Sequence, residues 1–254
     1  MFNSSVVMLF FNSIALLIFS VAFLTASTAE DADAKKKLRS HLKRDRLIAN
    51  GKQLRFRYGL IGRWADAIVP YEIEGSFIKK ELTAINNAFK EYHTKTCIRF
   101  KPRSSERDYI VIRRDNTGCW SSLGRLGGRQ VVNLQSTLCF RYYGTPMHEF
   151  MHALGFMHEQ NRAERDSYIR VLSQNVKNGA MVNFQKGSAL EHCAFGIPYD
   201  YASIMHYAKT SFSKNGKPTI EALKQTNEAR LMGQRNGFSK GDIAKLNAMY
   251  KCRK

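Results

Sequence analysis

Three histidines and a glutamate between positions 148 and 158 have the spacing of a metal centre. His148 and His152 are four residues apart, so on a helix they share one face and can bind the same ion. Glu149 follows the first histidine and points toward the side where a metal-bound water would lie. Gly155 can adopt positive φ and turn the chain back, which lets His158 approach as a third nitrogen ligand. Three histidines with a water molecule form an open, catalytic zinc site, so the sequence predicts one Zn²⁺ per chain.

The residues that flank the two helical histidines predict the limits of their helix. Thr145 is a favourable N-cap residue, and Pro146 suits the first helical position. Gly155 is the expected stop signal after the last helical residue.

The rest of the chain predicts an α+β domain. Apolar and β-branched runs predict strands at 67–73, 97–100, 109–112 and 130–134. Apolar residues at helical spacing predict an amphipathic helix over 77–94. Ser239 and Asp242 form a capping box at the start of a last helix over 239–250. Beyond position 160 the periodicity is weak, so loops should dominate there.

The N-terminal segment indicates the compartment. Residues 6–24 are nearly all apolar and are followed by the small residues Ser27 and Ala29, which predicts a signal peptide over 1–29. The polar and charged residues 30–57 are interpreted as a pro-segment, and 58–254 as the folded domain. We therefore expect a secreted, extracellular protein without a stable membrane anchor.

The five cysteines agree with an oxidising compartment. All of them follow position 96, and none has the C-x-x-C spacing of a structural zinc site. Four of the five could form two disulfides in three possible ways, which leaves one cysteine over.

The charge of the chain is strongly positive. The full sequence has 40 Lys and Arg against 21 Asp and Glu, a formal net charge of +19. Residues 30–57 contain ten of the basic and four of the acidic residues, so the remainder carries +13. Such a balance favours anionic partners but does not determine a fold.

Two motifs resemble those of a known family. HEFMHALGFMHE, residues 148–159, is similar to the zinc signature of the metzincin superfamily, and Glu159 after the third histidine is the mark of the astacin family. The sequence Ser203–Tyr207, SIMHY, resembles the astacin Met-turn. The resemblance also covers residues 95–103, 118–125 and 239–252. It suggests a minimal astacin zinc metalloendopeptidase with signal peptide, short pro-segment and catalytic domain only.

This resemblance implies a fold and a set of roles. The expected fold is a two-lobed, zincin-like catalytic domain, with a twisted mixed sheet and helices in the N-terminal lobe. The C-terminal lobe would be irregular and end in a helix, with zinc in the cleft between. Glu149 would be the general base, and Met205 the apolar floor beneath the metal. Tyr207 would be a further zinc ligand that swings away and donates a hydrogen bond to the tetrahedral intermediate.

The resemblance also implies the covalent links. The expected disulfides are Cys97–Cys252 and Cys119–Cys139, which leaves Cys193 without a family partner. In the family, Glu159 contacts the new N-terminus of the mature enzyme. Family zymogens offer zinc an aspartate in an F-x-G-D motif, but the closest string here, FRYGL at 56–60, lacks that aspartate. Latency by that route is therefore not expected, and two alternatives stay open: the pro-segment is a short remnant, or another residue blocks the metal.

Polypeptides in extended conformation are the expected substrates, added as a strand to a sheet edge, with acidic side chains favoured just after the cut bond. One alternative is a catalytically inactive binding protein with the same fold. Another is a basic secreted protein that binds polyanions, although residues 58–254 have no long basic run and nucleic acid is not an expected partner. A third is a different metzincin clan, against which Tyr207 and Glu159 argue.

Overall fold

A computed structural model describes residues 62–187 and 194–253 of the chain. All of them belong to one structural unit, Arg55–Lys254. The predicted signal peptide, the predicted pro-segment and Cys193 lie outside the described residues. Within the described part, no helix has both the length and the apolar character needed to cross a membrane.

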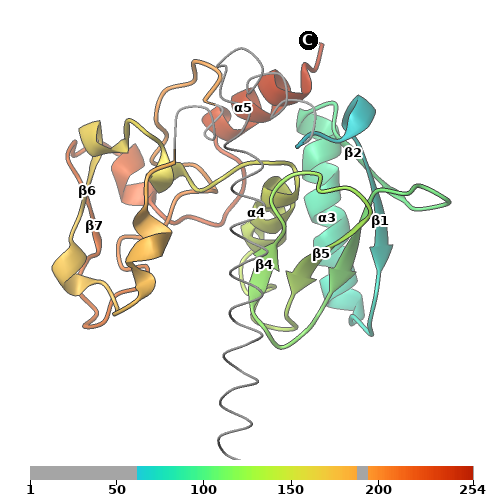
Figure 1. The fold of residues 1–254 in the computed structure, drawn as a ribbon, viewed down its shortest axis with the longest axis horizontal. Helices are drawn as coiled ribbons and strands as arrows, with labels where there is room; N and C mark the ends of the chain where they lie inside the picture. Colours follow the sequence, from blue (N-terminus) through green and yellow to red (C-terminus); the bar gives the residue numbers. More distant parts are fainter. Residues whose placement is uncertain (1–61, 188–193, 254) are drawn as a thin grey trace, which may run out of the picture. The chain divides into compact units, whose positions relative to one another are not determined.

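The N-terminal half is built on a five-stranded sheet (Figure 1). The strand order is β2-β1-β3-β5-β4, and β1, β2, β3 and β5 run parallel while β4 is antiparallel to β5. The central strands are buried because apolar side chains point to both faces, as in Ile110–Ile112. The strands are β1 (Ile68–Ile73), β2 (Arg99–Pro102), β3 (Tyr109–Arg113), β4 (Cys119–Ser121) and β5 (Arg129–Leu134).

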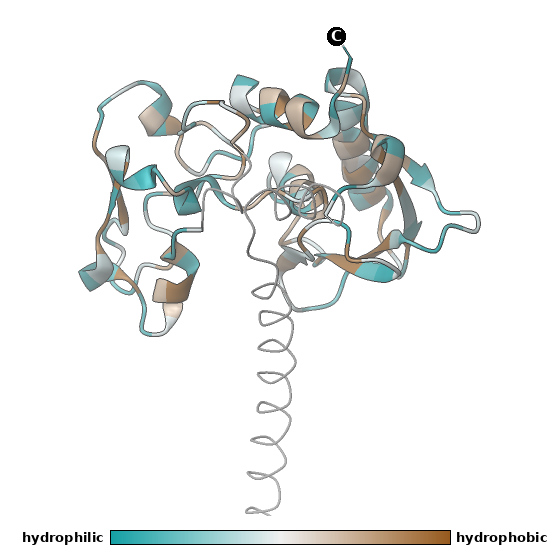
Figure 2. Cartoon of the chain, turned by 45° about the horizontal axis from the view of Figure 1, so that its top comes forward, coloured by the Kyte–Doolittle hydropathy of each residue, from teal (hydrophilic) through white to brown (hydrophobic). Residues whose placement is uncertain are grey.

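Two helices of this half share its core. Helix α3 (Lys79–Lys95) buries the stripe that contains Ile85, Phe89 and Tyr92. Helix α4 (Gly144–Ala153) packs beside it, with the rings of Phe89 and Phe150 4.9 Å apart. Figure 2 shows hydrophobic colour on these helices and on the sheet, and mostly hydrophilic colour on the connecting loops. Burial of these apolar faces is the main force that fixes α4 in place.

Helix α4 begins earlier than the sequence predicts. Its N-cap is Tyr143 rather than Thr145, and Pro146 is the third helical residue. The cause is a tertiary contact, because the backbone N–H of Gly144 donates to Arg235 O at 2.6 Å. A Cβ at position 144 would lie 2.6 Å from that same oxygen, so only glycine permits the approach. Long-range packing therefore outweighs the local capping preference of Thr145.

The C-terminal half has a separate small core. Short 3₁₀ helices and a two-stranded sheet, β6 (Ile169–Val171) paired antiparallel with β7 (Ile220–Ala222), surround residues such as Phe184 and Tyr201. These strands and β4 have only three residues each, which is too short to produce a recognisable alternation in the sequence. The 3₁₀ helices are Ala65–Ala67 in the N-terminal half and Glu159–Asn161, Arg165–Ser167, Ser173–Asn175, Ala180–Phe184 and Glu228–Leu231 after α4.

Helix α5 (Lys240–Tyr250) returns the chain to the N-terminal core. The predicted capping box is present, since the Ser239 hydroxyl accepts from Asp242 N at 2.9 Å and the Asp242 carboxylate accepts from Ser239 N at 3.0 Å. The structure contains the disulfides Cys97–Cys252 and Cys119–Cys139, the two pairs that the resemblance implies. The first one ties the end of α5 to the residues that follow α3.

The two disulfides should stabilise the fold unequally. They close loops of 155 and 20 residues, and the chain-entropy model assigns about 2 kcal/mol more stabilisation to the longer one. We expect C97S/C252S to lower the free energy of unfolding by that much more than C119S/C139S does. Equilibrium denaturation in urea of both double variants measures the difference, and equal losses would contradict the entropic explanation.

Candidate metal centre and active site

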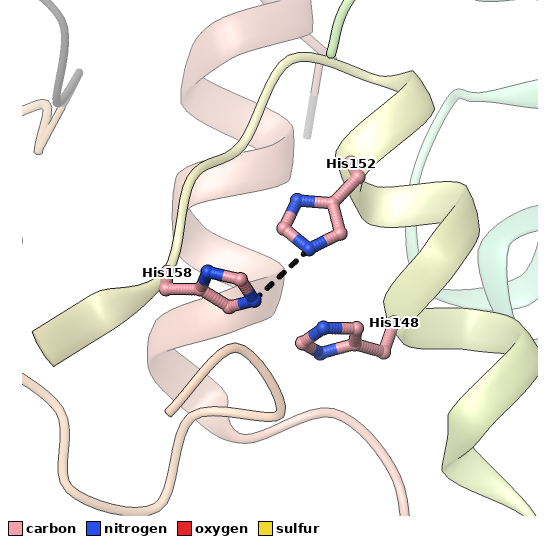
Figure 3. Close-up of side chains that lie close together, drawn as sticks. All are labelled: His148, His152 and His158. Carbon is pink, nitrogen blue, oxygen red and sulfur yellow. Dashed lines mark hydrogen bonds between the residues drawn. The ribbon is translucent and has the colours of Figure 1, made fainter. Parts of the chain in front are cut away.

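The three predicted histidines converge in the structure (Figure 3). His148 and His152 project from one face of α4, and His158 comes from the segment after the helix. Gly155 adopts φ +105° and reverses the chain between them. One ring nitrogen from each histidine lies within 4.8 Å of the other two, and Nε2 of His152 is 3.2 Å from Nε2 of His158.

These distances fit a zinc ion. Two ligands on a tetrahedral zinc with bonds of about 2.0–2.1 Å are separated by about 3.3 Å, close to the 3.2 Å observed. The other ring nitrogens are engaged, because Nδ1 of His148 lies 2.8 Å from Ile204 O and Nδ1 of His152 lies 2.7 Å from Phe156 O. A carbonyl can only accept, so each Nδ1 carries the proton and each Nε2 presents a lone pair.

Burial also keeps the helical histidines neutral. Desolvation lowers the pKa of His148 well below its usual value, with further lowering by His152 and Arg235. The same effect lowers the pKa of His152 to about 4. A metal therefore does not have to displace protons from these two rings near neutral pH.

Glu149 lies beside the histidines on α4 and is 5% exposed. Burial raises the pKa of its carboxyl to about 8, and the positive charge of Arg235 partly opposes this shift. A carboxyl with a pKa near neutrality can both accept and return a proton.

The segment Ser203–Tyr207 lies against the histidines through the contact of Ile204 O with His148. Its side chains reach both cores, because Met205 is buried in the N-terminal core and Tyr207 packs against the C-terminal core. The Tyr207 ring lies 4.5 Å from the His158 ring, centroid to centroid. Burial raises the pKa of this phenol to about 12, so it remains a hydrogen-bond donor.

Glu159 is held by two cations. Its Oε2 accepts from Lys245 Nζ at 2.6 Å, and its Oε1 accepts from Arg162 at 2.8 Å and from Asp200 N at 2.9 Å. Burial opposes ionisation, but the charges of Lys245 and Arg162 lower the pKa of Glu159 below its usual range. The N-terminus that the resemblance places near Glu159 falls outside the described residues.

Some residues of the site had no recognisable signal in the sequence. Asp242 was predicted only as a helix cap, yet its carboxylate also accepts from Ser203 Oγ at 2.6 Å and from Ile204 N at 2.8 Å. His206 is fully buried, with Nε2 2.7 Å from the Tyr199 hydroxyl and Nδ1 2.7 Å from Tyr207 O. Arg235 belongs to no recognisable sequence motif, and it is the fold that places its charge near Glu149.

Comparison with protein families agrees with this geometry. Residues 57–251 match the sequence model of the astacin peptidase family. The chain belongs to the astacin family. An astacin relative, zinc metalloproteinase nas-13 of Caenorhabditis elegans, is 46% identical over 191 residues, which is 75% of this chain and 41% of the relative. Zinc metalloproteinase nas-4 of the same organism is 45% identical over 192 residues, 75% of this chain and 59% of the relative.

A solved astacin has the same fold. High choriolytic enzyme 1, a hatching enzyme zinc-protease from Oryzias latipes, superposes with a TM-score of 0.69 at 39% identity. The superposition covers 75% of this chain and 94% of that structure. By contrast, the chain spans only about 40–60% of the length of the two nematode relatives. The shared part is therefore the astacin domain.

Loss of one ligand should abolish tight metal binding. We expect His152→Ala to weaken zinc binding at least 100-fold, because two imidazoles cannot complete the coordination that three provide. Chelator competition with the purified protein measures the dissociation constant. His93→Gln is the matched control, since His93 lies in α3 and accepts from Phe100 N. Equal zinc affinity of wild type and His152→Ala would exclude this site.

Proposed function

We propose that this chain is a secreted, zinc-dependent endopeptidase that cleaves polypeptides. The observation that carries the proposal is the convergence of His148, His152 and His158 beside the buried carboxyl of Glu149. The membership of the chain in a peptidase family supports it.

Glu149 is assigned the role of general base. When bound by the three histidines, zinc would polarise the attacking water and the scissile carbonyl and would favour the ionised form of this carboxyl. Glu149 would take a proton from the water while the water oxygen attacks the carbonyl carbon. It would then deliver that proton to the leaving amine. The raised pKa of the buried carboxyl suits both steps.

Tyr207 is assigned another role in the same reaction. It would be a further zinc ligand that swings aside and donates a hydrogen bond to the developing oxyanion. Its ring lies against His158, and burial keeps the phenol protonated. A donor that acts on the charge formed in the transition state lowers the barrier more than one that binds only the ground state. Met205, 1% exposed in the core, would supply the apolar floor of the site.

The geometry suggests how a substrate would bind. Strand β4 is at the edge of the sheet and contacts α4, and its Trp120 is 40% exposed. An extended peptide can add to such an edge through backbone hydrogen bonds. Arg235 places a partly buried positive charge within electrostatic reach of Glu149 and Tyr207. An acidic side chain next to the scissile bond would neutralise this charge.

The N-terminal sequence supports the compartment. Residues 1–29 have the pattern of a signal peptide, and residues 30–57 would be removed as a pro-segment. The two disulfides of the domain agree with an oxidising environment.

An inactive binding protein with this fold is the main competing function. The presence of Glu149 and Tyr207 beside a complete histidine triad favours the enzyme. A polyanion-binding protein would need none of these residues to converge.

Removal of the base should abolish cleavage without loss of metal. We expect Glu149→Gln to lower kcat/KM about 10²–10⁴-fold, because the amide cannot accept the proton of the attacking water. Hydrolysis of casein and of a fluorogenic peptide measures the loss. Zinc content, determined in parallel, should stay at one per chain. Cleavage by Glu149→Gln at the wild-type rate would contradict the mechanism, and wild-type activity that survives zinc chelation would contradict the function.

Arg235 should determine a preference for acidic residues. In paired peptides with Asp or Asn after the scissile bond, we expect wild type to favour Asp by about tenfold in kcat/KM, and Arg235→Gln to lose most of this ratio. Lys240→Gln, an exposed change of equal charge, is the control. If the Asp-to-Asn ratio of kcat/KM is the same in Arg235→Gln as in wild type, Arg235 does not determine specificity. If that ratio is one in wild type, the enzyme has no acidic preference.

A further inference from the structure

A buried cluster of three charges lies next to the third histidine. Glu159, Arg162 and Lys245 are each 4% exposed, and the Glu159 carboxylate bridges the two cations. Lys245 is on α5, 86 residues along the chain from Glu159. A full charge is costly to bury, so each partner depends strongly on the others.

The two cations are not equivalent. Arg162 also donates to Glu164 at 2.5 Å and to the backbone oxygens of Pro198 and Ile197. It therefore keeps other acceptors if Glu159 shifts. Lys245 Nζ has Glu159 as its hydrogen-bond partner among the described residues, and Oε2 of Glu159 has Lys245 as its own. This contact is the one that joins Glu159 to α5.

His158 and Glu159 are coupled through the backbone. The two residues are adjacent, and the backbone N–H of Glu159 donates to Met205 O at 3.1 Å. His158 is the N-cap residue of the 3₁₀ helix Glu159–Asn161, and its carbonyl accepts from Asn161 N at 3.1 Å, so its backbone belongs to the same turn as Glu159. A displacement of the carboxylate would move the imidazole that must meet the helical pair.

The same helix supports a second ligand through a different charge. Asp242, one turn before Lys245, accepts from Ile204 N at 2.8 Å, and Ile204 O accepts from Nδ1 of His148. Through Asp242 and Lys245, helix α5 thus contacts two different segments, one that holds the Nδ1 proton of His148 and one that carries His158.

We propose that Lys245 is a positioning residue for His158 and acts through Glu159 to preorganise the zinc site. The inference rests on the proposed use of the histidine triad as a zinc site. Lys245 touches neither metal nor substrate; it fixes the segment from which the third ligand projects. Residues that orient a metal ligand typically change metal affinity 10- to 100-fold when they are lost.

The test compares zinc affinity among variants of the full chain. Lys245→Met keeps an unbranched side chain, one atom shorter than lysine, but leaves the Glu159 carboxylate short of one cation. We expect its zinc dissociation constant, measured by chelator competition, to rise 10- to 100-fold. Its kcat should fall, while KM for a short peptide changes less than twofold. Lys240→Met, on the exposed side of α5, should match wild type in all three quantities.

A double variant separates positioning from simple loss of a salt bridge. Glu159→Gln/Lys245→Met removes both charges, so no buried carboxylate that has lost one of its two cations remains beside His158. We expect it to bind zinc more tightly than Lys245→Met alone. The visible absorption of the Co²⁺-substituted proteins should change in Lys245→Met and return toward wild type in the double variant. This spectrum reports the ligand geometry independently of activity.

Each result decides the proposal. Zinc affinity and cobalt spectrum unchanged in Lys245→Met would overturn it, as would a lower thermal stability with wild-type zinc affinity. If Lys245→Met does not fold, the double variant still tests the inference, because zinc affinity below that of wild type supports it and wild-type affinity without the Lys245–Glu159 contact overturns it. A wild type that binds zinc but cleaves no polypeptide would defeat the proposed function and leave this test intact.

Discussion

The site depends on a hydrogen-bonding constraint, because each helical imidazole must present its Nε2 lone pair to one point. Two backbone carbonyls impose it by taking the Nδ1 proton, Ile204 O for His148 and Phe156 O for His152. Neither carbonyl belongs to the same helical turn as the ring it fixes. The Met-turn and the reversal at Gly155 are therefore as necessary to the metal centre as the helix itself.

Burial explains why this arrangement persists. The helix that carries His148 and His152 ends in the core, where its last carbonyls need partners. Trp64 Nε1 donates to Ala153 O at 2.9 Å, and the Tyr250 hydroxyl donates to Leu154 O at 3.0 Å. These donors come from the beginning and the end of the domain. Residues far from the histidine motif in sequence thus hold the end of α4 from which the chain turns toward His158.

The local pattern predicted what local chemistry determines. The i, i+4 pair, the glycine reversal and the capping box at Ser239 each need only neighbouring residues, and the structure has all three. The resemblance supplied the remaining architecture. The start of α4 was predicted wrongly because a hydrogen bond between Gly144 and Arg235 decides it. These two residues are far apart in the sequence, so a local pattern cannot reveal their contact. The partners of Glu159 were missed for the same reason.

The charges of the site show how the distant parts are matched. Burial raises the pKa of the Glu149 carboxyl and so favours its protonated form. Glu159 is equally buried, but two cations face it and lower its pKa, so it stays ionised. Two glutamates of one motif thus have opposite electrostatic surroundings: burial favours the protonated form of the first, and two cations favour the anionic form of the second. The difference lies in α5 and the loop around Arg162, not in the motif. The twelve-residue signature supplies both carboxyl groups, but their different protonation follows in part from residues outside it, with Lys245 of the C-terminal helix among them.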